Sequence, residues 1–571
     1  MYKNLLVIIA FAVSFNLTAQ IKTTIFPDGN AFKEFPMLNK INKEEIPLYI
    51  MPFFNLDSIL QEEKELDEKG VGRPFRFGYA FDVDYGMEHG KWLELEDKNI
   101  WSIRFKSNGA YTINFEFTDL KLNNKSELYV YNSVGTVIDG PITSKDNATE
   151  RFRHIGSDLI AGDEAIIQII KPKSLRQTSI LKISKVVHGF RNHYREILPS
   201  NEKVGDNFQA LDCYYDAMCL IPYGPIFENE SRGVAMLMVG NSGFCSGALL
   251  NNQLGTNRPY FLTAFHCADA DNNGMLSNSE KNTAESWSFQ FGYKKTTCNG
   301  SSTVFIDKYY FANFRAAFWE TDFLLLELKD AVTDPDVRFL GWDALPAIPP
   351  GAYPLPPFAS PITMGVCLHH PAGNPMKISV DNSVIDFFRF PIPWTDGPTS
   401  PSTTHYDVYF DISTVERGSS GAPLFDQNKR VRGQLHGGFN ISCIANMKFF
   451  GALEISMLGG GTTETSLYNW LVPYPTGTAT NDFRTNTIVP CQSIVWNRNV
   501  TKDERIVCKV INVNNVSISS GATLKLEATE KITIGTNVTV QAGAKLELIG
   551  GTVSIDYGTF KVMEGASLII K

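Results

Sequence analysis

Three short segments, far apart in the chain, carry side chains that together could form a nucleophilic site. The stretch GSSG at 418–421 places a hydroxyl between glycines, which let a backbone approach a substrate closely. His266 follows an apolar run and precedes a cysteine, and Asp322 begins the apolar run FLLLEL. A serine that attacks a carbonyl needs a histidine to accept its proton and a carboxylate to orient that histidine. We therefore expect Ser420 as nucleophile, His266 as general base and Asp322 as its partner.

Each of these residues also has an ordinary interpretation. Ser420 could be a turn serine, His266 a hydrogen-bonded core histidine and Asp322 a strand cap. The chain order His, Asp, Ser is one of the three orders known for acyl-transfer triads, and it favours the catalytic interpretation of all three together. The same interpretation predicts an oxyanion hole formed by the N–H groups of Gly418 and Ser420.

Length and composition limit the function classes. A chain of 571 residues is too long for one core, so three or more domains are expected. Its 52 basic and 61 acidic residues give a net charge of −9, without the clustered basic excess of a nucleic-acid-binding protein. Residues 1–19 have the charge, apolar run and small residues of a signal peptide, and no other stretch is apolar enough to span a membrane. We expect a secreted protein, extracellular or at the cell surface.

Patterning divides the rest of the chain into three regions, all mainly β. Alternating segments predict a β-sandwich within residues 20–205, preceded by a charged helix at 56–69. Residues 206–478 are strand-dominated, with a closing helix expected at 465–471, and the triad order favours two packed β-barrels. In residues 479–571, GA motifs at Gly521, Gly543 and Gly565 recur every 22 residues, which predicts a β-solenoid or stacked sheet. This last module carries no repeated acid or nucleophile, so a role in binding a cell surface or the export machinery is expected.

Six motifs in one order resemble the bacterial lysyl endopeptidases (Achromobacter-type protease), within the trypsin-like clan. They are CSGALLNN at 245–252, RPYFLTAFHC at 258–267, TDFLLLEL at 321–328, LHHP at 368–371, GSSGAPLF at 418–425 and GQLHGG at 433–438. The resemblance covers about 208–475 and implies a double β-barrel serine endopeptidase. The region before it resembles that family's propeptide, including RPFRFGY at 73–79. It implies a proenzyme whose residues 20–205 chaperone or block the site.

The resemblance also implies pairings for the cysteines and a stack beside the triad. Three disulfides are implied, and they are Cys213–Cys443, Cys219–Cys298 and Cys245–Cys267. Cys491 and Cys508 could join in the tail, and Cys367 has no partner in the family. Trp394 and His436 match a tryptophan and a histidine that stack next to the triad aspartate; either could instead be barrel packing. Ser419 stands where trypsin has the aspartate that receives its new N-terminus, so activation by such a salt bridge is not expected.

The primary specificity pocket departs from the family. In the family an aspartate three residues before a glycine binds the substrate lysine, whereas that position here is Lys448, in a shorter loop. A cation at the pocket base would repel lysine and favour a carboxylate, which predicts cleavage after Glu or Asp. The alternatives are a neutral pocket, with Lys448 turned out to solvent, and a lysine-specific pocket of unusual construction.

The loop after Cys267 matches the calcium-binding pattern D-x-[DN]-x-[DN]-G-x₅-E at every specified position. Its expected ligands are Asp269, Asp271, Asn273, the Met275 carbonyl, Ser277 and Glu280. No pair of flanking helices is evident, so this would be an isolated structural Ca²⁺ loop; the alternative is a solvated acidic loop. No cofactor is expected for catalysis, and zinc is not favoured, because His369 and His370 are adjacent and no HExxH or CxxC occurs.

Two further functions stay open at this point. One is a true lysyl endopeptidase. The other is a non-catalytic adhesion or binding protein that retains the protease fold as a scaffold, which the presence of all three triad residues disfavours. On the first interpretation the partners are protein or peptide substrates, with no nucleic acid and no membrane span.

Overall fold

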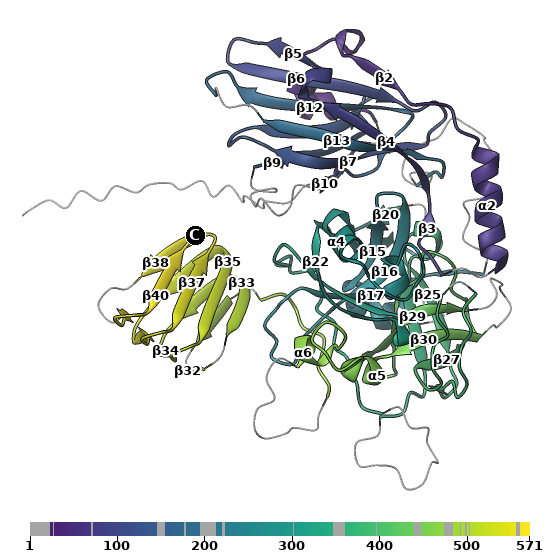
Figure 1. Ribbon diagram of the computed structural model, residues 1–571, viewed down its shortest axis with the longest axis vertical. Helices are drawn as coiled ribbons and strands as arrows, with labels where there is room; N and C mark the ends of the chain where they lie inside the picture. The colour runs from purple at the N-terminus through teal and green to yellow at the C-terminus, as the bar shows by residue number, and fades with distance from the viewer. Residues whose placement is uncertain are drawn as a thin grey trace, which may run out of the picture.

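The computed structural model contains three β-rich units in chain order (Figure 1). It describes residues 23–26, 28–69, 72–144, 155–175, 179–193, 213–219, 223–300, 302–346, 360–395, 397–438, 443, 447–472, 483–491, 493–496, 499–501, 503–555 and 560–571. The expected signal peptide and the linker at 199–207 lie outside the described residues. Within the described part, no helix is long and apolar enough to cross a membrane.

The N-terminal unit is a sandwich of two sheets. The seven-stranded sheet has the order β1 (Thr23–Ile25), β9 (Val137–Thr143), β8 (Glu127–Asn132), β12 (Glu164–Pro172), β6 (Lys98–Lys106) and β2 (Leu48–Ile50), with β5 (Lys91–Glu94) also on β6. The five-stranded sheet has the order β10 (Ile155–Gly156), β7 (Thr112–Lys121), β13 (Ile180–Gly189) and β4 (Gly78–Gly86), with β11 (Ile160–Ala161) on β7. Alternate apolar residues of facing strands, such as Ile103 and Phe115, are fully buried between the sheets.

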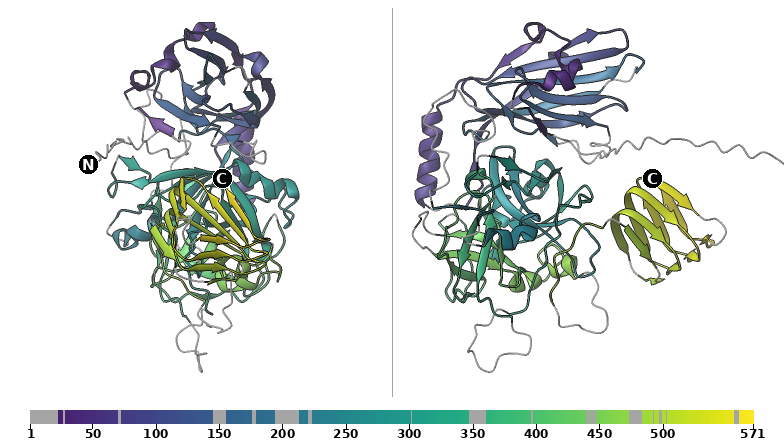
Figure 2. Two further views of the ribbon diagram at one scale, coloured as in Figure 1. Left: turned by 90° about the vertical axis from the view of Figure 1, so that its left-hand side faces the viewer. Right: turned by 180° about the vertical axis from the view of Figure 1, so that it is seen from behind.

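Two elements at the start of this unit leave the sandwich. Helix α2 (Leu56–Lys69) has the bounds expected from the sequence, and Figures 1 and 2 show it running alongside the second unit. Strand β3 (Phe75–Arg76) was expected to open the sandwich, but it pairs with the second unit instead. The alternation in this segment is genuine strand patterning, but pattern alone does not decide which sheet edge a strand joins.

The second unit carries two eight-stranded antiparallel sheets. The first has the order β21 (Asp307–Tyr310), β18 (Ser288–Phe291), β15 (Val234–Val239), β16 (Gly243–Leu250), β17 (Tyr260–Ala264), β23 (Phe323–Leu328) and β22 (Ala312–Phe318), with β3 added to β16. The second has the order β14 (Tyr215–Asp216), β25 (Lys377–Asp381), β24 (Gly365–His369), β28 (Pro423–Phe425), β29 (Val431–Gly438), β30 (Met447–Ala452), β27 (His405–Tyr409) and β26 (Asp386–Phe387). Each sheet surrounds its own apolar core, and a third core joins the two. This is the double-barrel, trypsin-like arrangement expected from the triad order.

The closing helix of this unit is shorter than expected. Helix α6 spans Tyr468–Leu471, and the residues from Thr465 to Leu467 form a turn and bend before it. Leu467 and Leu471 are fully buried in the core that joins the barrels. The docking role expected for this helix is therefore carried by two leucines four residues apart, which lie on one face of a single helical turn.

The C-terminal unit is a small parallel β-solenoid, drawn in yellow in Figures 1 and 2. One sheet has the order β31 (Ser493–Trp496), β33 (Glu504–Val513), β35 (Thr523–Ile534), β37 (Lys545–Ile549) and β40 (Ser567–Ile570), with β38 (Thr552–Ile555) also on β35. The other sheet has the order β32 (Asn499–Val500), β34 (Val516–Ile518), β36 (Val538–Val540) and β39 (Phe560–Val562). Thr523 pairs with Lys545, and Lys545 pairs with Ser567, so each coil advances by the repeat seen in the sequence. The solenoid rather than a stacked sheet is thus the outcome.

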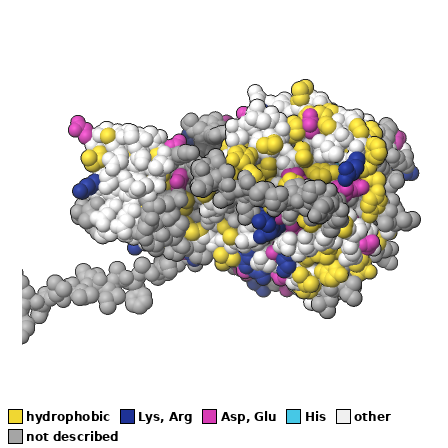
Figure 3. Space-filling model, turned by 90° about the horizontal axis from the view of Figure 1, so that it is seen from below, with side chains coloured by type: hydrophobic (Ala, Val, Ile, Leu, Met, Phe, Trp, Pro, Cys, Tyr) yellow, Lys and Arg dark blue, Asp and Glu magenta, His cyan; other side chains and the backbone are white. Residues whose placement is uncertain are grey.

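Figure 3 shows one face of the molecule, on which only the described residues are coloured by type. There, Lys and Arg side chains are interspersed with Asp, Glu and apolar side chains. A groove that binds a phosphate backbone needs a continuous basic stripe. This face therefore agrees with the charge balance of the sequence.

Candidate active site

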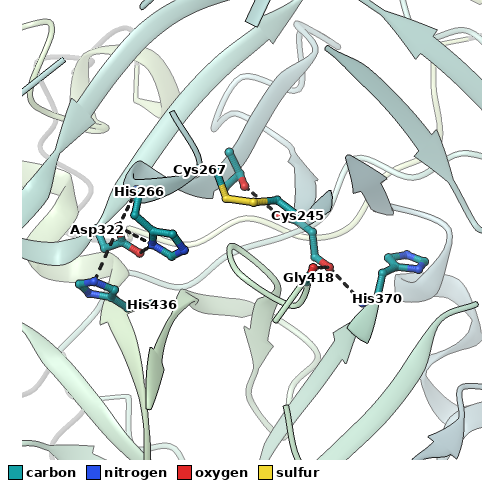
Figure 4. The surroundings of a disulfide bond; sticks show 9 residues. Cys245, His266, Cys267, Asp322, His370, Gly418 and His436 are labelled. Carbon is teal, nitrogen blue, oxygen red and sulfur yellow. Dashed lines mark hydrogen bonds and ion pairs between the residues drawn. A yellow bond between two sulfur atoms is a disulfide. The ribbon is translucent and has the colours of Figure 1, made fainter. Parts of the chain in front are cut away.

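His266 is held at the end of β17 by a short helix and a disulfide. The 3₁₀ helix η5 (Phe265–Cys267) directly follows β17, and Cys267 is bonded to Cys245 on the neighbouring β16 (Figure 4). The imidazole Nδ1 lies 2.9 Å from Oδ2 and 3.1 Å from Oδ1 of Asp322, and the backbone N–H of His266 donates to Oδ1 at 3.0 Å. A histidine whose Nδ1–H is held by a carboxylate presents Nε2 as a base.

Asp322 is fixed by its own backbone conformation. It lies between the 3₁₀ helix η7 (Trp319–Thr321) and β23, with a φ of 57°, and it is 2% exposed. Burial raises the pKa of its carboxyl, while the hydrogen bonds from His266 act in the opposite direction. The Asp322 carboxylate is therefore bound to His266. The structure thus brings together the two residues that the sequence predicts as partners.

Ser420 lies on a tight turn that packs against the first barrel. Gly418 and Gly421 have φ values of 87° and 83°, and a Cβ at Gly421 would lie 2.7 Å from the backbone nitrogen of Ala264. Only glycine allows the turn to come this close to the residues that precede His266. The Ser246 N–H donates to the Ser420 carbonyl at 2.8 Å, and the Ser246 hydroxyl donates to the Gly418 carbonyl at 2.8 Å. The nucleophile turn is therefore attached to β16, beside the Cys245–Cys267 disulfide.

The hydrogen-bonding groups needed for catalysis are open at this turn. Among the described residues, neither the Gly418 N–H nor the Ser420 N–H donates a hydrogen bond, which leaves both for an oxyanion. The buried Nε2 of His266 likewise has no partner within the described part of the chain. Catalytic hydrogen bonds are often long before substrate binds, and tighten in the complex.

The aromatic rings of Trp394 and His436 lie beside the triad. Trp394 stacks on His436 with ring centroids 3.7 Å apart, and His436 stacks on His266 at 5.6 Å. His436 Nε2 lies 3.9 Å from Oδ1 of Asp322. The structure therefore places Trp394 and His436 next to the triad aspartate, as the resemblance implied. Burial holds the pKa of His436 well below its usual value, so the ring is neutral at pH 7.

Two histidines in this region have roles that the sequence did not indicate. His405 Nε2 lies 2.9 Å from Nδ1 of His436, which extends the row of rings by one member. His369 Nδ1 lies 2.7 Å from the Ser419 hydroxyl, and its Nε2 lies 3.0 Å from the Ser379 hydroxyl. Both histidines are fully buried. The motif LHHP contains His369, whereas no sequence motif marks His405. In the structure, His369 holds Ser419, the residue before Ser420, by a hydrogen bond.

Lys448 is buried in the wall next to the triad. It lies on β30 opposite Gly438 of β29, and a Cβ at Gly438 would be 3.3 Å from Lys448 Nζ. The residue is 2% exposed, so the alternative in which it turns out to solvent is wrong. Burial lowers the pKa of the ammonium to about 8, and the nearby Glu416 carboxylate acts against this shift. The group is therefore a cation at pH 7, with Glu416 in its surroundings.

The calcium-type loop forms one wall of a small cavity beside His266. The cavity is lined by Gly72, Phe265, His266, Asp269, Asn272, Gly274, Trp319, Asp322, Trp394, Gly397, Pro398 and His436. Within the loop, Asp269 accepts from the N–H groups of Asn273 and Gly274, and one carboxylate oxygen each of Asp269, Asp271 and Glu280 lie within 4.8 Å of one another. No pair of flanking helices was expected, and the structure has a single short helix after the loop, α4 (Asn278–Thr283), which carries Glu280 in its first turn.

Several of the expected ligand groups of this loop also form hydrogen bonds within it. Ser277 caps α4 by accepting from the Glu280 N–H, and Glu280 in return accepts from the Ser277 N–H and hydroxyl. Asn273 accepts from the Met275 N–H. Like charges within the cluster help to raise the pKa of Asp269, although burial is the larger cause. The loop is thus closed by its own hydrogen bonds around a concentration of carboxylate oxygens.

The disulfides implied by the resemblance all form. Cys213–Cys443, Cys219–Cys298 and Cys245–Cys267 lie in the second unit, and Cys491–Cys508 ties the start of the solenoid. Cys367 is free and buried on β24. Burial raises the pKa of this thiol well above its usual value, so it behaves as a small apolar side chain.

Comparisons with known proteins match the segment that carries this site. Residues 209–449 match the family model described as lysyl endopeptidase, C-terminal domain. The lysyl endopeptidase of Pseudomonas aeruginosa is 28% identical over 301 residues, which cover 49% of this chain and 56% of that protein. The chain thus spans little more than half the length of this curated relative. The resemblance is confirmed over the segment that carries the triad.

The solved structures to which part of this chain is similar include two proteases. The protease domain of MamO from Magnetospirillum magneticum is 12% identical, with a TM-score of 0.26, over 40% of this chain and 96% of that one. The Rv3671c protease from M. tuberculosis in its active form is 16% identical, with a TM-score of 0.26, over 42% of this chain and 84% of that one. Because these scores are low, the strand order and pairing described above carry the fold assignment.

Proposed function

We propose that this protein is a secreted serine endopeptidase that hydrolyses peptide bonds through an acyl-enzyme on Ser420. The observation that carries the proposal is the buried pair of His266 and Asp322 beside a glycine turn with two unused N–H groups. A signal peptide at residues 1–19 fits export, and the four disulfides fit an oxidising compartment. Residues 20–205 would then be the pro-region of a precursor.

The chemistry follows from the positions of the three groups. The Ser420 hydroxyl attacks the substrate carbonyl carbon as its proton moves to Nε2 of His266. The developing oxyanion receives the Gly418 and Ser420 N–H groups, each worth roughly 3–4 kcal/mol in such sites. His266 then gives its proton to the leaving amine, the C–N bond breaks, and water hydrolyses the acyl-enzyme by the same route. Asp322 stabilises the imidazolium at both steps.

A phosphonate serine probe tests this proposal directly. We expect covalent labelling of the chain after residues 20–205 have been removed, and none in the Ser420→Ala variant. Ser419→Ala is the matched control, because its hydroxyl is adjacent but bonded to His369, and it should still be labelled. Equal labelling of the parent and Ser420→Ala, or no labelling of either, contradicts the proposal and returns the non-catalytic binding protein as the better account.

The proposed primary preference is for Glu or Asp before the cleaved bond. Its support is the buried ammonium of Lys448 against Gly438, two residues from the ring of His436 that contacts the triad. An ammonium in a partly desolvated pocket attracts a carboxylate and repels a second ammonium. Glu416 lies near enough to offset part of this charge. Digestion of a peptide library measures the preference, and efficient cleavage after lysine would favour a lysyl endopeptidase instead.

A structural Ca²⁺ ion in the loop at 269–280 is also part of the proposal. Three carboxylate groups converge there, and oxygen ligands at these spacings suit Ca²⁺. The residues present fit such an ion, with Asp269, Asp271, Asn273 and Glu280 as its side-chain ligands. The ion would stiffen the wall of the cavity beside His266 and take no part in bond making.

A further inference from the structure

Residues 72–77, between α2 and the sandwich, begin beside His266 of the candidate site. A Cβ at Gly72 would lie 3.6 Å from Cγ of His266, and Gly72 lines the cavity that Trp394 and His436 also line. Two residues later, Pro74 contacts Gly243 at the beginning of β16; a Cβ on that glycine would lie 2.7 Å from the proline Cβ. Phe75 and Arg76 then pair with Phe244 and Gly243 in antiparallel register.

The crossing point is fixed by contacts at both ends. On β16, the Ser246 N–H donates to the Ser420 carbonyl, so the strand that receives Phe75 is the strand that holds the nucleophile turn. A chain that touches His266 at Gly72 and β16 at Pro74 has only Arg73 between these contacts. We infer that Gly72–Phe77 occupies the peptide-binding groove in the extended form of a substrate, with the Arg73–Pro74 bond across the nucleophile. This inference rests on the proposed function.

Several interactions hold the segment in the groove. The Phe77 and Phe244 rings stack with centroids 4.4 Å apart, and the Phe77 N–H donates to the Ser242 carbonyl at 2.8 Å. The Arg191 side chain donates from Nε to the Arg76 carbonyl at 3.0 Å. Apolar residues of the sandwich and of the barrel, including Met236 and Phe244, share one continuous core. The segment Gly72–Phe77, which we call the plug, is therefore anchored by the whole interface between the two units.

The side chain next to the nucleophile is directed to the pro-region. Nη1 of Arg73 lies 2.5 Å from Oε1 of Glu63 on α2, and Nη2 donates to the Glu63 backbone carbonyl at 3.4 Å. Glu63 is 3% exposed and the Arg73 side chain is 16% exposed, so the carboxylate is buried and the guanidinium is largely shielded from solvent. A buried pair that loses one partner leaves an uncompensated charge and becomes unfavourable. Arg73 is thus pinned to α2 and does not enter a pocket that contains the cation of Lys448.

The residue after Arg73 also disfavours cleavage of the plug. Pro74 has a fixed φ and no N–H, so strand pairing with β16 can begin only at Phe75. The Pro74 nitrogen is part of a tertiary amide. If the Arg73–Pro74 bond were cleaved, the leaving group would stay in a strand that remains paired with β16. The segment therefore fills the groove as a peptide would and is not turned over. The occupied edge of β16 is where the residues after the cleaved bond of a true substrate would lie.

Labelling of the intact precursor tests the inference. We expect the full-length chain to react with the phosphonate probe at least about tenfold more slowly than the processed chain. Glu63→Gln and Arg73→Gln should each raise the labelling rate of the uncleaved precursor by about tenfold, because either one breaks the buried pair. Glu65→Gln, on the exposed side of the same helix, is the matched control and should leave the rate unchanged. If wild-type precursor and processed chain react equally fast, the endopeptidase proposal stands and the plug is wrong.

Hydrogen exchange tests the plug without any catalysis. In the full-length Ser420→Ala chain, we expect the amides of residues 75–77 and 243–246 to exchange slowly. Adding Arg73→Gln should speed exchange at 75–77 by at least about tenfold and leave the sandwich strands unchanged. Rapid exchange at 75–77 in the parent would overturn the inference, even if the probe never labels the protein. A failure of the proposed function and a failure of the plug are thereby separated.

Discussion

At the scale of single residues, the site depends on the charge and protonation state of a few side chains. Asp322 has a committed partner, His436 is held neutral by burial, and Lys448 remains a cation because its lowered pKa is still above 7. The row from His266 through His436 to His405 links rings from two barrels. Asp322 and Lys448 are 2% exposed and the His436 side chain is 11% exposed, so solvent screens their interactions only weakly.

The charge of Lys448 gives a prediction with a defined pH dependence. Replacing it by Met should lower the ratio of kcat/KM for a Glu substrate to that for a matched Gln substrate by about tenfold, the effect of roughly 1.4 kcal/mol of lost attraction. In the parent enzyme the same ratio should fall as the pH rises through about 8, where the ammonium loses its proton. Peptide pairs assayed between pH 6.5 and 9 measure both effects. Lys561→Met, on the exposed surface of the solenoid, is the control, and a ratio that does not change in Lys448→Met contradicts the charge model.

At the scale of elements, two devices position the catalytic groups. The Cys245–Cys267 disulfide joins β16, which holds the nucleophile turn, to η5, which carries His266. The loop at 269–280 continues directly from η5 and walls the cavity beside the imidazole. The disulfide and the loop both hold the few residues that lie between the first barrel and the site.

Removing the disulfide should separate stability from activity. The double variant Cys245→Ser/Cys267→Ser should lose roughly 2–4 kcal/mol of unfolding free energy, as expected for a loop of this length. It should also lose most kcat, because the histidine and the nucleophile turn are no longer tied through adjacent strands. Cys491→Ser/Cys508→Ser is the control and should keep its kcat, since that bond lies at the solenoid. Urea unfolding in the Ser420→Ala background and peptide assays give the two quantities, and full activity without the first disulfide would contradict this role.

Calcium should matter to both stability and substrate affinity. Adding Ca²⁺ should raise the melting temperature by about 2–4 °C, and a chelator should reverse this change. Because Asp269 and Gly274 line the cavity beside His266, chelation should also raise KM more than it lowers kcat. Asp271→Asn should abolish the response, whereas Asp334→Asn, in an unrelated exposed turn, should keep it. If neither the melting temperature nor KM changes on adding Ca²⁺ or chelator, the loop is closed by its own hydrogen bonds alone.

At the scale of the whole molecule, buried charged groups join the three units. Glu327 on β23 is 1% exposed and accepts from Arg258, Arg315 and Arg505, the last of which belongs to the solenoid. Burial alone would raise the pKa of this carboxyl, but the three guanidinium groups lower it to about 2. Between sandwich and barrel, Lys308 lies 2.6 Å from Asp158 in a buried pair. These contacts make the units parts of one assembly.

Buried histidines predict that the precursor loses stability in acid. Burial lowers the pKa of His188, His193 and His370 to about 4 and that of His405 to about 3. The unfolded chain binds protons at these groups near pH 6.5, whereas the folded chain does not. The stabilisation is therefore complete above pH 6.5 and is lost as the pH falls toward 4, by about 2 kcal/mol at pH 5 for each fully buried group.

Urea unfolding of the full-length Ser420→Ala chain at pH 7.5 and pH 5 measures this loss. His370→Gln should reduce the difference between the two pH values, since glutamine does not titrate and can still donate to the Asn374 carbonyl. His89→Gln, at a side chain about one third exposed, should leave the difference unchanged. A stability that does not change between the two pH values would contradict the buried neutral histidines.

The sequence alone determined features that local pattern or chain order can carry. The bounds of α2 and the 22-residue repeat of the solenoid follow from periodicity, which repeats every few residues and needs no distant partner. The roles proposed for His266, Asp322 and Ser420 follow from residue type and order, because acyl transfer needs these three groups. The disulfides came from family resemblance rather than from spacing.

Only the tertiary structure decided which distant segments meet. That β3 joins β16, that Gly72 lies over His266, and that His369 anchors Ser419 are contacts between residues 50 to about 194 positions apart. The burial of Lys448 was equally open, since a single lysine can line a pocket or face water. Such contacts depend on how finished sheets pack, and no local pattern encodes the edge that a two-residue strand will find. The proposed nucleophile could be predicted from the sequence, whereas the contacts of Gly72 with His266 and of Phe75 with β16 required the fold.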